Sequence, residues 1–137
     1  MTYVYDTSFV GPLIIPDEKN QRVEKAHAAV ADDELIYVPQ LFWYEITNIF
    51  KNMLRRKRYS YDEVRQFYQP LAAIRLTCDS ETGIDYSKKL LRLCNDYNLS
   101  SYDAAYLELA ERKNAVLYTL GETFSAAAKR HGVAVIK

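Results

Sequence analysis

Five short apolar runs, separated by segments with helical periodicity, most strongly constrain how this chain of 137 residues can fold. The runs are rich in β-branched and aromatic residues, which is typical of buried strands. Strands that alternate with helices form a parallel sheet, because each crossover returns the chain in the same direction. We therefore predict an α/β fold with three layers, α/β/α, around a central five-stranded parallel sheet. The predicted strands are residues 2–5, 35–38, 74–78, 115–120 and 133–136.

The segments between these runs carry signals for helix starts and stops. Pro16 followed by two acids marks one start, Pro39 opens a long amphipathic segment, and Ser60 with Glu63 has the spacing of a capping box. Residues 9–15 are apolar but interrupted by glycine and proline, and no helix is assigned to them. We predict helices over residues 16–31, 39–58, 60–67, 79–98, 100–113 and 124–130, placed on both faces of the sheet.

Composition narrows the possible functions. Lysines and arginines number 18, as do aspartates and glutamates, so the chain lacks the overall positive field of a dedicated duplex-DNA binder. Hydrophobic residues make up 49% of the chain, and the length fits a single domain over residues 1–137. Without a secretory leader or an apolar run of roughly 18 residues, we expect a cytoplasmic protein that does not enter membranes. Cys78 and Cys94 lack metal-ligand spacing and are interpreted as small core residues.

The first strand ends in an acid that is a candidate for chemistry. Asp6 directly follows residues 2–5 and is followed by Thr7 and Ser8. Ligands bind at the carboxyl ends of the strands in open parallel sheets, so a carboxylate at this point is available to a substrate or a metal. The alternative is a purely local role, because Asp and Ser also cap the amino ends of helices.

Two further acids follow other predicted strands. Glu45 lies in the second turn of the helix after the second strand, among aromatic residues, where a carboxylate is costly unless it is paired or bound to a cation. The alternative for Glu45 is an exposed position on an amphipathic helix. Asp103 lies in the first turn of another predicted helix, three residues after Ser100. The alternative for its carboxylate is a local role in a capping box with Ser100.

Taken together, Asp6, Glu45 and Asp103 favour a shared site. Carboxylates that come from separate segments and meet at one edge of a sheet form the oxygen-rich, incomplete cage that Mg²⁺ or Mn²⁺ prefers. Such a site activates water and stabilises charge on a phosphoryl group, which suits the hydrolysis of phosphodiesters. The chain contains neither a GxxxxGK[ST] loop nor a GxGxxG fingerprint, which disfavours a Walker-type nucleotide site and dinucleotide binding.

Several segments along the whole chain resemble the PIN-domain family, and within it the VapC-type toxins of type II toxin–antitoxin modules. The most specific is Leu99-Ser100-Ser101-Tyr102-Asp103-Ala104-Ala105-Tyr106. The other similar segments are residues 5–8, 39–46, 117–120 and 127–133.

The resemblance implies a PIN-like fold and a metal-dependent endoribonuclease that uses Mg²⁺ or Mn²⁺. It also implies that Asp6, Glu45 and Asp103 are the metal ligands, and that the hydroxyls of Ser8 and Thr119 line the site. By the same resemblance, the partners would be an RNA substrate, a cognate antitoxin protein and a second copy of the chain in a homodimer.

The chain departs from the family pattern at one position. The family usually places a fourth acid after the fourth strand, where this chain has Gly121. Glu122 is adjacent and is a weaker candidate ligand, because a shift of one residue at a turn points the side chain elsewhere. The alternative function is therefore a catalytically impaired PIN module that binds RNA or protein.

A basic corner at the end of the long helix is a candidate RNA contact. It is followed by Tyr59 and Tyr61, so it could bind a phosphate backbone while bases stack on aromatic rings. The alternative is a solvated helix end, where cations complement the helix dipole. The residues of the corner are Arg55, Arg56, Lys57 and Arg58.

Overall fold

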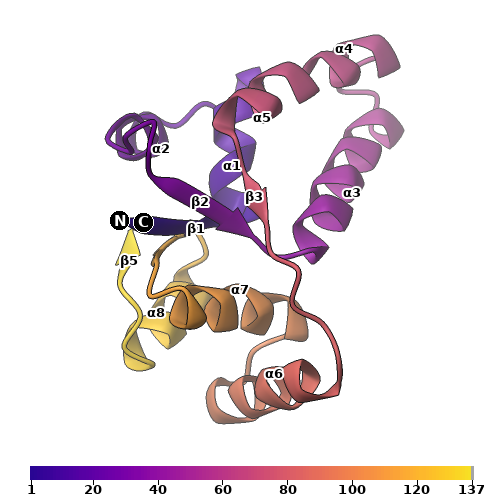
Figure 1. Cartoon of the computed structure of the whole chain (residues 1–137). Helices are drawn as coiled ribbons and strands as arrows, with labels where there is room; N and C mark the ends of the chain where they lie inside the picture. Colours follow the sequence, from indigo (N-terminus) through magenta and orange to yellow (C-terminus); the bar gives the residue numbers. More distant parts are fainter. Residues whose placement is uncertain (137) are drawn as a thin grey trace.

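The sheet is built from five parallel strands in the order β3-β2-β1-β4-β5 in the computed structural model, which describes residues 1–136 (Figure 1). The first strand in the chain lies at the centre, because it pairs with β2 on one side and with β4 on the other. The predicted central parallel sheet is therefore confirmed. The strands are β1 (Thr2–Tyr5), β2 (Leu35–Val38), β3 (Thr77–Cys78), β4 (Val116–Tyr118) and β5 (Val135–Ile136).

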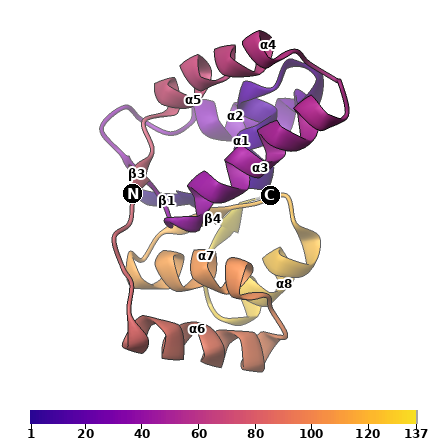
Figure 2. The same cartoon turned by 90° about the vertical axis from the view of Figure 1, so that its right-hand side faces the viewer.

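Helices cover both faces of the sheet. Helices α1 to α5 lie on one face and α6 to α8 on the other, as the two views in Figures 1 and 2 show. No helix within residues 1–136 is long and apolar enough to cross a membrane. The helices are α1 (Thr7–Ile14), the 3₁₀ turn η1 (Pro16–Glu18), α2 (Gln21–Ala28), α3 (Leu41–Arg55), α4 (Tyr61–Gln66), α5 (Tyr68–Ile74), α6 (Ile84–Tyr97), α7 (Ser101–Arg112) and α8 (Glu122–Arg130).

Alternation along β1 divides the core into two clusters. Tyr3 and Tyr5 point into the cluster beneath α1 to α5, and Val4 points into the cluster beneath α6 to α8. The ring of Tyr5 stacks on that of Tyr118 with centroids 5.2 Å apart, and Phe9 packs edge-on against Tyr118 at 4.9 Å. Burial of each such side chain contributes roughly 1.5–3 kcal/mol, so the central strand is held firmly from both faces.

The helix α1 differs from the sequence prediction, which assigned no helix to residues 9–15. It begins directly after Asp6 and contains Pro12, whose ring removes one backbone hydrogen bond. Most of its residues are buried, so tertiary packing outweighs this loss. Because apolar residues cover most sides of the helix, its sequence shows no amphipathic pattern. The predicted helix from Pro16 is accordingly a 3₁₀ turn followed by α2, which starts after the Asn20 cap.

The link between β3 and α6 also differs from the prediction. Helix α6 begins at Ile84 and not at Asp79, because the Asp79 N–H donates to the Val38 carbonyl at 2.8 Å and prolongs the sheet pairing. Ile84 is 77% exposed and Leu91 69%, so the apolar stripe predicted for α6 is only partly buried. Cys78 is exposed, and its interpretation as a core residue was wrong.

A partly buried ion network connects this link to α7. The Arg112 guanidinium donates to both carboxylate oxygens of Asp79, at 3.0 and 2.7 Å, and to both of Glu108, at 2.8 and 3.0 Å. Glu108 is only 3% exposed, so its charge depends on this single arginine. The network sets the position of α7 relative to the carboxyl end of β3.

Candidate active site

The carboxyl ends of β1 and β4 meet the amino-terminal turns of α1, α7 and α8 at one pocket of about 320 Å³. Every metal-ligand and hydroxyl candidate from the sequence lines it, together with Gly121 and the weaker candidate Glu122. The residues of this acidic pocket are Asp6, Thr7, Ser8, Glu45, Asp103, Tyr106, Thr119, Gly121, Glu122, Thr123 and Phe124.

Asp6 caps α1 and also lines the acidic pocket. Its Oδ1 accepts the Phe9 N–H at 3.2 Å, which caps α1, and the Ser8 hydroxyl at 2.5 Å. Only 8% of Asp6 is exposed, and this remaining surface faces the acidic pocket. Burial raises the pKa of the Asp6 carboxyl above its ordinary value, although hydrogen bonds from Ser8, Thr119 and Phe9 act in the opposite direction.

Glu45 is held by a tyrosine to which the sequence reasoning assigned no role. The buried Tyr106 hydroxyl donates to Glu45 Oε1 at 2.5 Å. Tyr106 lies three residues after Asp103 on α7 and therefore projects from the same face of that helix. Burial raises the pKa of the Glu45 carboxyl, the Tyr106 bond opposes this, and the charges of Asp6 and Asp103 add to the rise.

Asp103 projects into the pocket from the first turn of α7. Its backbone N–H donates to the Ser100 hydroxyl at 3.1 Å, so Ser100 is the helix cap. The other half of a capping box is missing, because the Asp103 carboxylate accepts no hydrogen bond from any residue within 1–136. Burial raises the pKa of this carboxyl as well.

Two hydroxyls fix the chain around Asp6. The Ser8 hydroxyl accepts the Leu120 N–H at 2.9 Å and lies 3.4 Å from the Thr119 hydroxyl. The Thr119 hydroxyl in turn accepts the Gly121 N–H at 3.0 Å. These bonds join the start of α1 to the turn after β4, so the geometry of Asp6 depends on both segments.

Gly121 lies at the rim of the acidic pocket, as the N-cap residue of α8. Its φ of −73° is accessible to any residue. A Cβ at this position would lie 3.5 Å from the Thr119 hydroxyl and 3.6 Å from Phe124 Cβ, which are ordinary contacts. The backbone would therefore accept the acid that this chain lacks.

The donor set of the acidic pocket is suited to a hard divalent cation. Asp6, Glu45 and Asp103 offer carboxylate oxygens, and a positive charge among them would offset the burial that raises the pKa of each and the repulsion that adds to the rise at Asp6 and Glu45. Within residues 1–136, no three Asp, Glu, His or Cys side chains lie close enough to hold one ion as they are placed. As placed, the acids do not form a closed cage, so a metal bound among them would keep several of its waters, as Mg²⁺ does.

The basic corner of α3 lies outside the acidic pocket. Arg56 follows Glu45 by eleven residues, which is about 16 Å along a helix. Arg58 Nη2 binds both oxygens of Asp17 at 2.8 Å, and Arg55 contacts Asn52 at 3.4 Å. The structure thus does not bring this corner to the acids, and Arg58 is already paired with a protein carboxylate.

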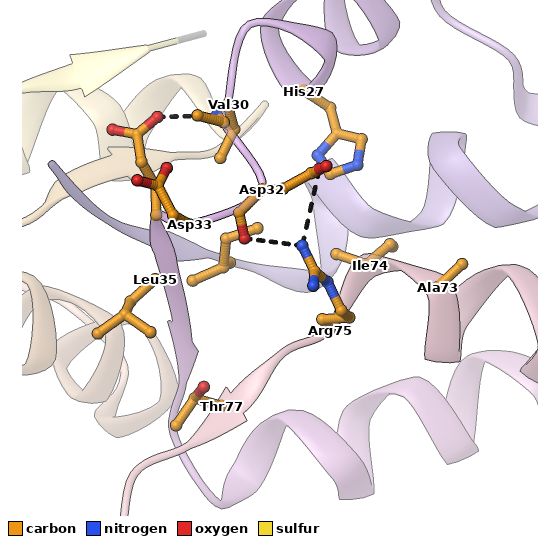
Figure 3. A pocket seen from close by; sticks show the side chains of 12 residues that line it. His27, Val30, Asp32, Asp33, Leu35, Ala73, Ile74, Arg75 and Thr77 are labelled. Carbon is orange, nitrogen blue, oxygen red and sulfur yellow. Dashed lines mark hydrogen bonds and ion pairs between the residues drawn. The ribbon is translucent and has the colours of Figure 1, made fainter.

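A second pocket, of about 300 Å³, lies at the opposite end of the strands (Figure 3). Arg75, at the end of α5, reaches across it and donates to the Asp32 carbonyl at 2.8 Å. The pocket is lined by the first residues of β2 and β3, Leu35 and Thr77, whereas Asp6 follows the last residue of β1. None of the candidate site residues reaches it.

The fold and the acidic pocket together define a PIN domain. The family model described as "PIN domain" matches residues 3–130, and the chain belongs to this family. The PIN-like fold predicted from the sequence is thus confirmed.

Individual relatives refine this classification. The chain is 27% identical over 120 residues to Ribonuclease VapC3 of Pyrobaculum aerophilum. The aligned region covers 88% of this chain and 89% of that protein. Mycobacterium tuberculosis VapC20, described as a sarcin-ricin loop cleaving toxin, has a TM-score of 0.64 at 19% identity, covering 91% of this chain and 94% of that one. A toxin–antitoxin complex from Klebsiella pneumoniae contains a chain with a TM-score of 0.63 at 16% identity. The match covers 98% of this chain and 96% of that one. The two structural matches show a shared fold.

Proposed function

We propose that this protein is a Mg²⁺- or Mn²⁺-dependent endoribonuclease, the toxin of a VapBC-type toxin–antitoxin pair that acts in the cytoplasm. The observation that carries the proposal is the placement of Asp6, Glu45 and Asp103 in one pocket at the carboxyl ends of the strands. Membership of the PIN family and the names of the relatives VapC3 and VapC20 support the class of reaction.

In this proposal the three acids hold the metal, and the metal when bound lowers the pKa of a water and neutralises charge on the phosphodiester. The chain contributes rigidity. The Ser8 hydroxyl and the Phe9 N–H orient Asp6, and Tyr106 orients Glu45, so neither carboxylate has to reorganise on binding. Asp103 accepts no such bond and keeps both oxygens available to the metal and its waters.

Three adjoining hollows make room for a polymer. The acidic pocket shares Thr7 and Glu45 with a neighbouring pocket of about 530 Å³, and it shares Thr7 and Ser8 with another of about 660 Å³. Thr7 directly follows Asp6 and lines all three pockets, so the hollowed surface beside the acids extends past the acidic pocket. A chain bound along these adjoining pockets would extend past the acids, which suits a polymer such as RNA.

The test is cleavage of purified structured RNAs in the presence of Mg²⁺ or Mn²⁺. We expect internal cuts by the wild-type protein and none by Asp6→Asn, which keeps the cap and the hydroxyl contact but removes the charge. The alternative, a catalytically impaired module, predicts no cleavage by the wild type and cleavage once Gly121→Asp restores a fourth acid. If neither the wild type nor Gly121→Asp cuts the RNA, the result would refute both the active ribonuclease and the impaired module.

The remaining partners belong to the same proposal. The similarity to a chain of a toxin–antitoxin complex supports an antitoxin as the protein partner. We also propose a homodimer and a single domain over residues 1–137; the second is supported by the placement of all five strands in one sheet. Light scattering of the purified protein would measure the mass of the particle, and a monomer at micromolar concentration would argue against the dimer.

A further inference from the structure

The pocket of about 530 Å³ beside the acids has two tyrosines in its lining. Tyr44 comes from α3 and Tyr102 from the first turn of α7, and they immediately precede Glu45 and Asp103 in the chain. The residues that line this aromatic pocket are Thr7, Leu41, Tyr44, Glu45, Asn48, Ile49 and Tyr102.

The two tyrosine rings are available to a ligand. Tyr44 is 75% exposed and Tyr102 is 61% exposed. Neither has a hydrogen bond or a ring contact with any residue in 1–136, whereas Tyr5, Tyr106 and Tyr118 are buried in the core. Two unpartnered rings that wall one hollow present apolar surface that a flat ligand would cover.

The spacing of α3 adds a polar group to the same wall. Leu41, Tyr44, Glu45 and Asn48 fall at i, i+3, i+4 and i+7, so they share one face of the helix. The exposed Asn48 amide has no partner within residues 1–136 and offers both a donor and an acceptor. Its amide can pair with the edge of a base while the rings contact the faces.

We propose that the aromatic pocket binds one unpaired base of the RNA substrate, with the rings of Tyr44 and Tyr102 against the base, next to the phosphodiester at the acids. The inference rests on the proposed ribonuclease function. A base fits better than a phosphate, because the one ionisable side chain in the lining that is charged at neutral pH is the carboxylate Glu45. Stacking on exposed aromatic rings is the usual way in which proteins bind unpaired bases, and it tolerates different sequences.

The subsite would select for RNA in which a base next to the cut is free to leave its stack. A base in a regular helix cannot enter the pocket, so loops and bulges would be cut in preference to duplexes. The pocket thus indicates that the substrates are RNAs with unpaired segments. It does not predict a particular base sequence.

The test uses short RNAs that carry the fluorescent base 2-aminopurine at single positions of a loop, mixed with wild-type protein in EDTA so that no cleavage occurs. We expect quenching at one or two adjacent positions, loss of that quenching in Tyr44→Ala and Tyr102→Ala, and recovery in the Tyr→Phe variants, which keep the ring. Tyr68→Ala is the matched control, because Tyr68 is 47% exposed but lies outside this pocket and is not part of the candidate RNA contact at the basic corner.

Kinetics with Mg²⁺ separate this inference from the proposed function. If the wild type cleaves, we expect each alanine variant to raise KM about tenfold with little change in kcat, since one stacking contact is lost. Cleavage by the wild type with unchanged KM in both alanine variants would overturn the subsite and leave the ribonuclease intact. If the wild type cleaves nothing, position-specific quenching would still support the pocket as a base site.

Two other results would assign the pocket to a protein. A dimer that dissociates in Tyr44→Ala or Tyr102→Ala, with quenching unchanged, would make it a contact between copies of this chain. Loss of binding to a purified antitoxin, again with quenching unchanged, would make it a peptide site. Either result overturns the base subsite.

Discussion

Removal of Arg112 is expected to destabilise the protein strongly. In the wild type, one guanidinium makes four hydrogen bonds to Asp79 and Glu108, over distances of 2.7 to 3.0 Å. The variant Arg112→Met keeps much of the apolar stem but leaves Glu108, which is 3% exposed, with a buried and unpaired charge. Breaking a buried ion pair from one side typically costs about 3–5 kcal/mol.

The assay is urea unfolding followed by circular dichroism, with Arg112→Met compared to the wild type. We expect the free energy of unfolding to fall by about 3–5 kcal/mol, and the melting temperature by about 10–15 °C for a chain of this size. The control is Arg112→Met combined with Glu108→Gln, which removes the stranded charge and should regain part of the loss.

The pH dependence gives an independent check on the same network. Burial pushes the pKa of the Asp79 carboxyl up, but the hydrogen bond and charge of Arg112 bring it below its ordinary value. Because the folded pKa is depressed, the stability that Asp79 contributes is present above the unfolded pKa near 4 and is lost as pH falls through the folded value. If Arg112→Met unfolds with the same free energy and the same acid profile as the wild type, the assignment of this network is refuted.

Three further predictions concern the acids. Asp6→Asn should raise the free energy of unfolding without metal at pH 7, because burial raises the Asp6 pKa, so its charge costs stability above the folded pKa and nothing below the unfolded pKa. In calorimetry, Mg²⁺ should stabilise the wild type but not the variant. Tyr106→Phe should raise the Glu45 pKa and move the acid limb of the cleavage profile to higher pH, whereas Tyr5→Phe, whose hydroxyl is bonded to His27 at 2.9 Å, should not. Gly121→Asp should bind Mg²⁺ more tightly by calorimetric titration, with Gly121→Asn as the neutral control; equal affinities would show that the added side chain only caps α8.

The sequence predicts those parts of the molecule in which local pattern and tertiary packing agree. Strand β1 is a run of β-branched and aromatic residues that ends in Asp6, and the rule that ligands gather at the carboxyl ends of strands was enough to bring Asp6, Glu45 and Asp103 into one pocket. The cap at Ser100 was also predictable from the sequence, because a helix cap forms between residues that are close together in the chain.

The elements that sequence reasoning missed depend on distant contacts. Helix α1 contains Pro12 and is buried on most sides, so it shows neither a good propensity nor a polar face. The start of α6 is displaced because Asp79 pairs with a strand and with Arg112, 33 residues away. Tyr106 belongs to the segment that most resembles the PIN family, but its role was not predicted. A tyrosine on a buried helix face is interpreted as a core residue until its partner Glu45, 61 residues earlier, is placed beside it.

The bonds between Ser8 and the turn after β4 set the order in which the site can appear during synthesis. The Leu120 N–H and the Ser8 hydroxyl are 112 residues apart in the chain, and β1 lies between β2 and β4 in the sheet. A growing chain therefore carries Asp6, Glu45 and even Asp103 on the ribosome before β4 exists to complete the central strand's pairing. The acidic pocket becomes whole only when the segment from 116 to 124 has emerged, so an incomplete chain has its acids but not their arrangement.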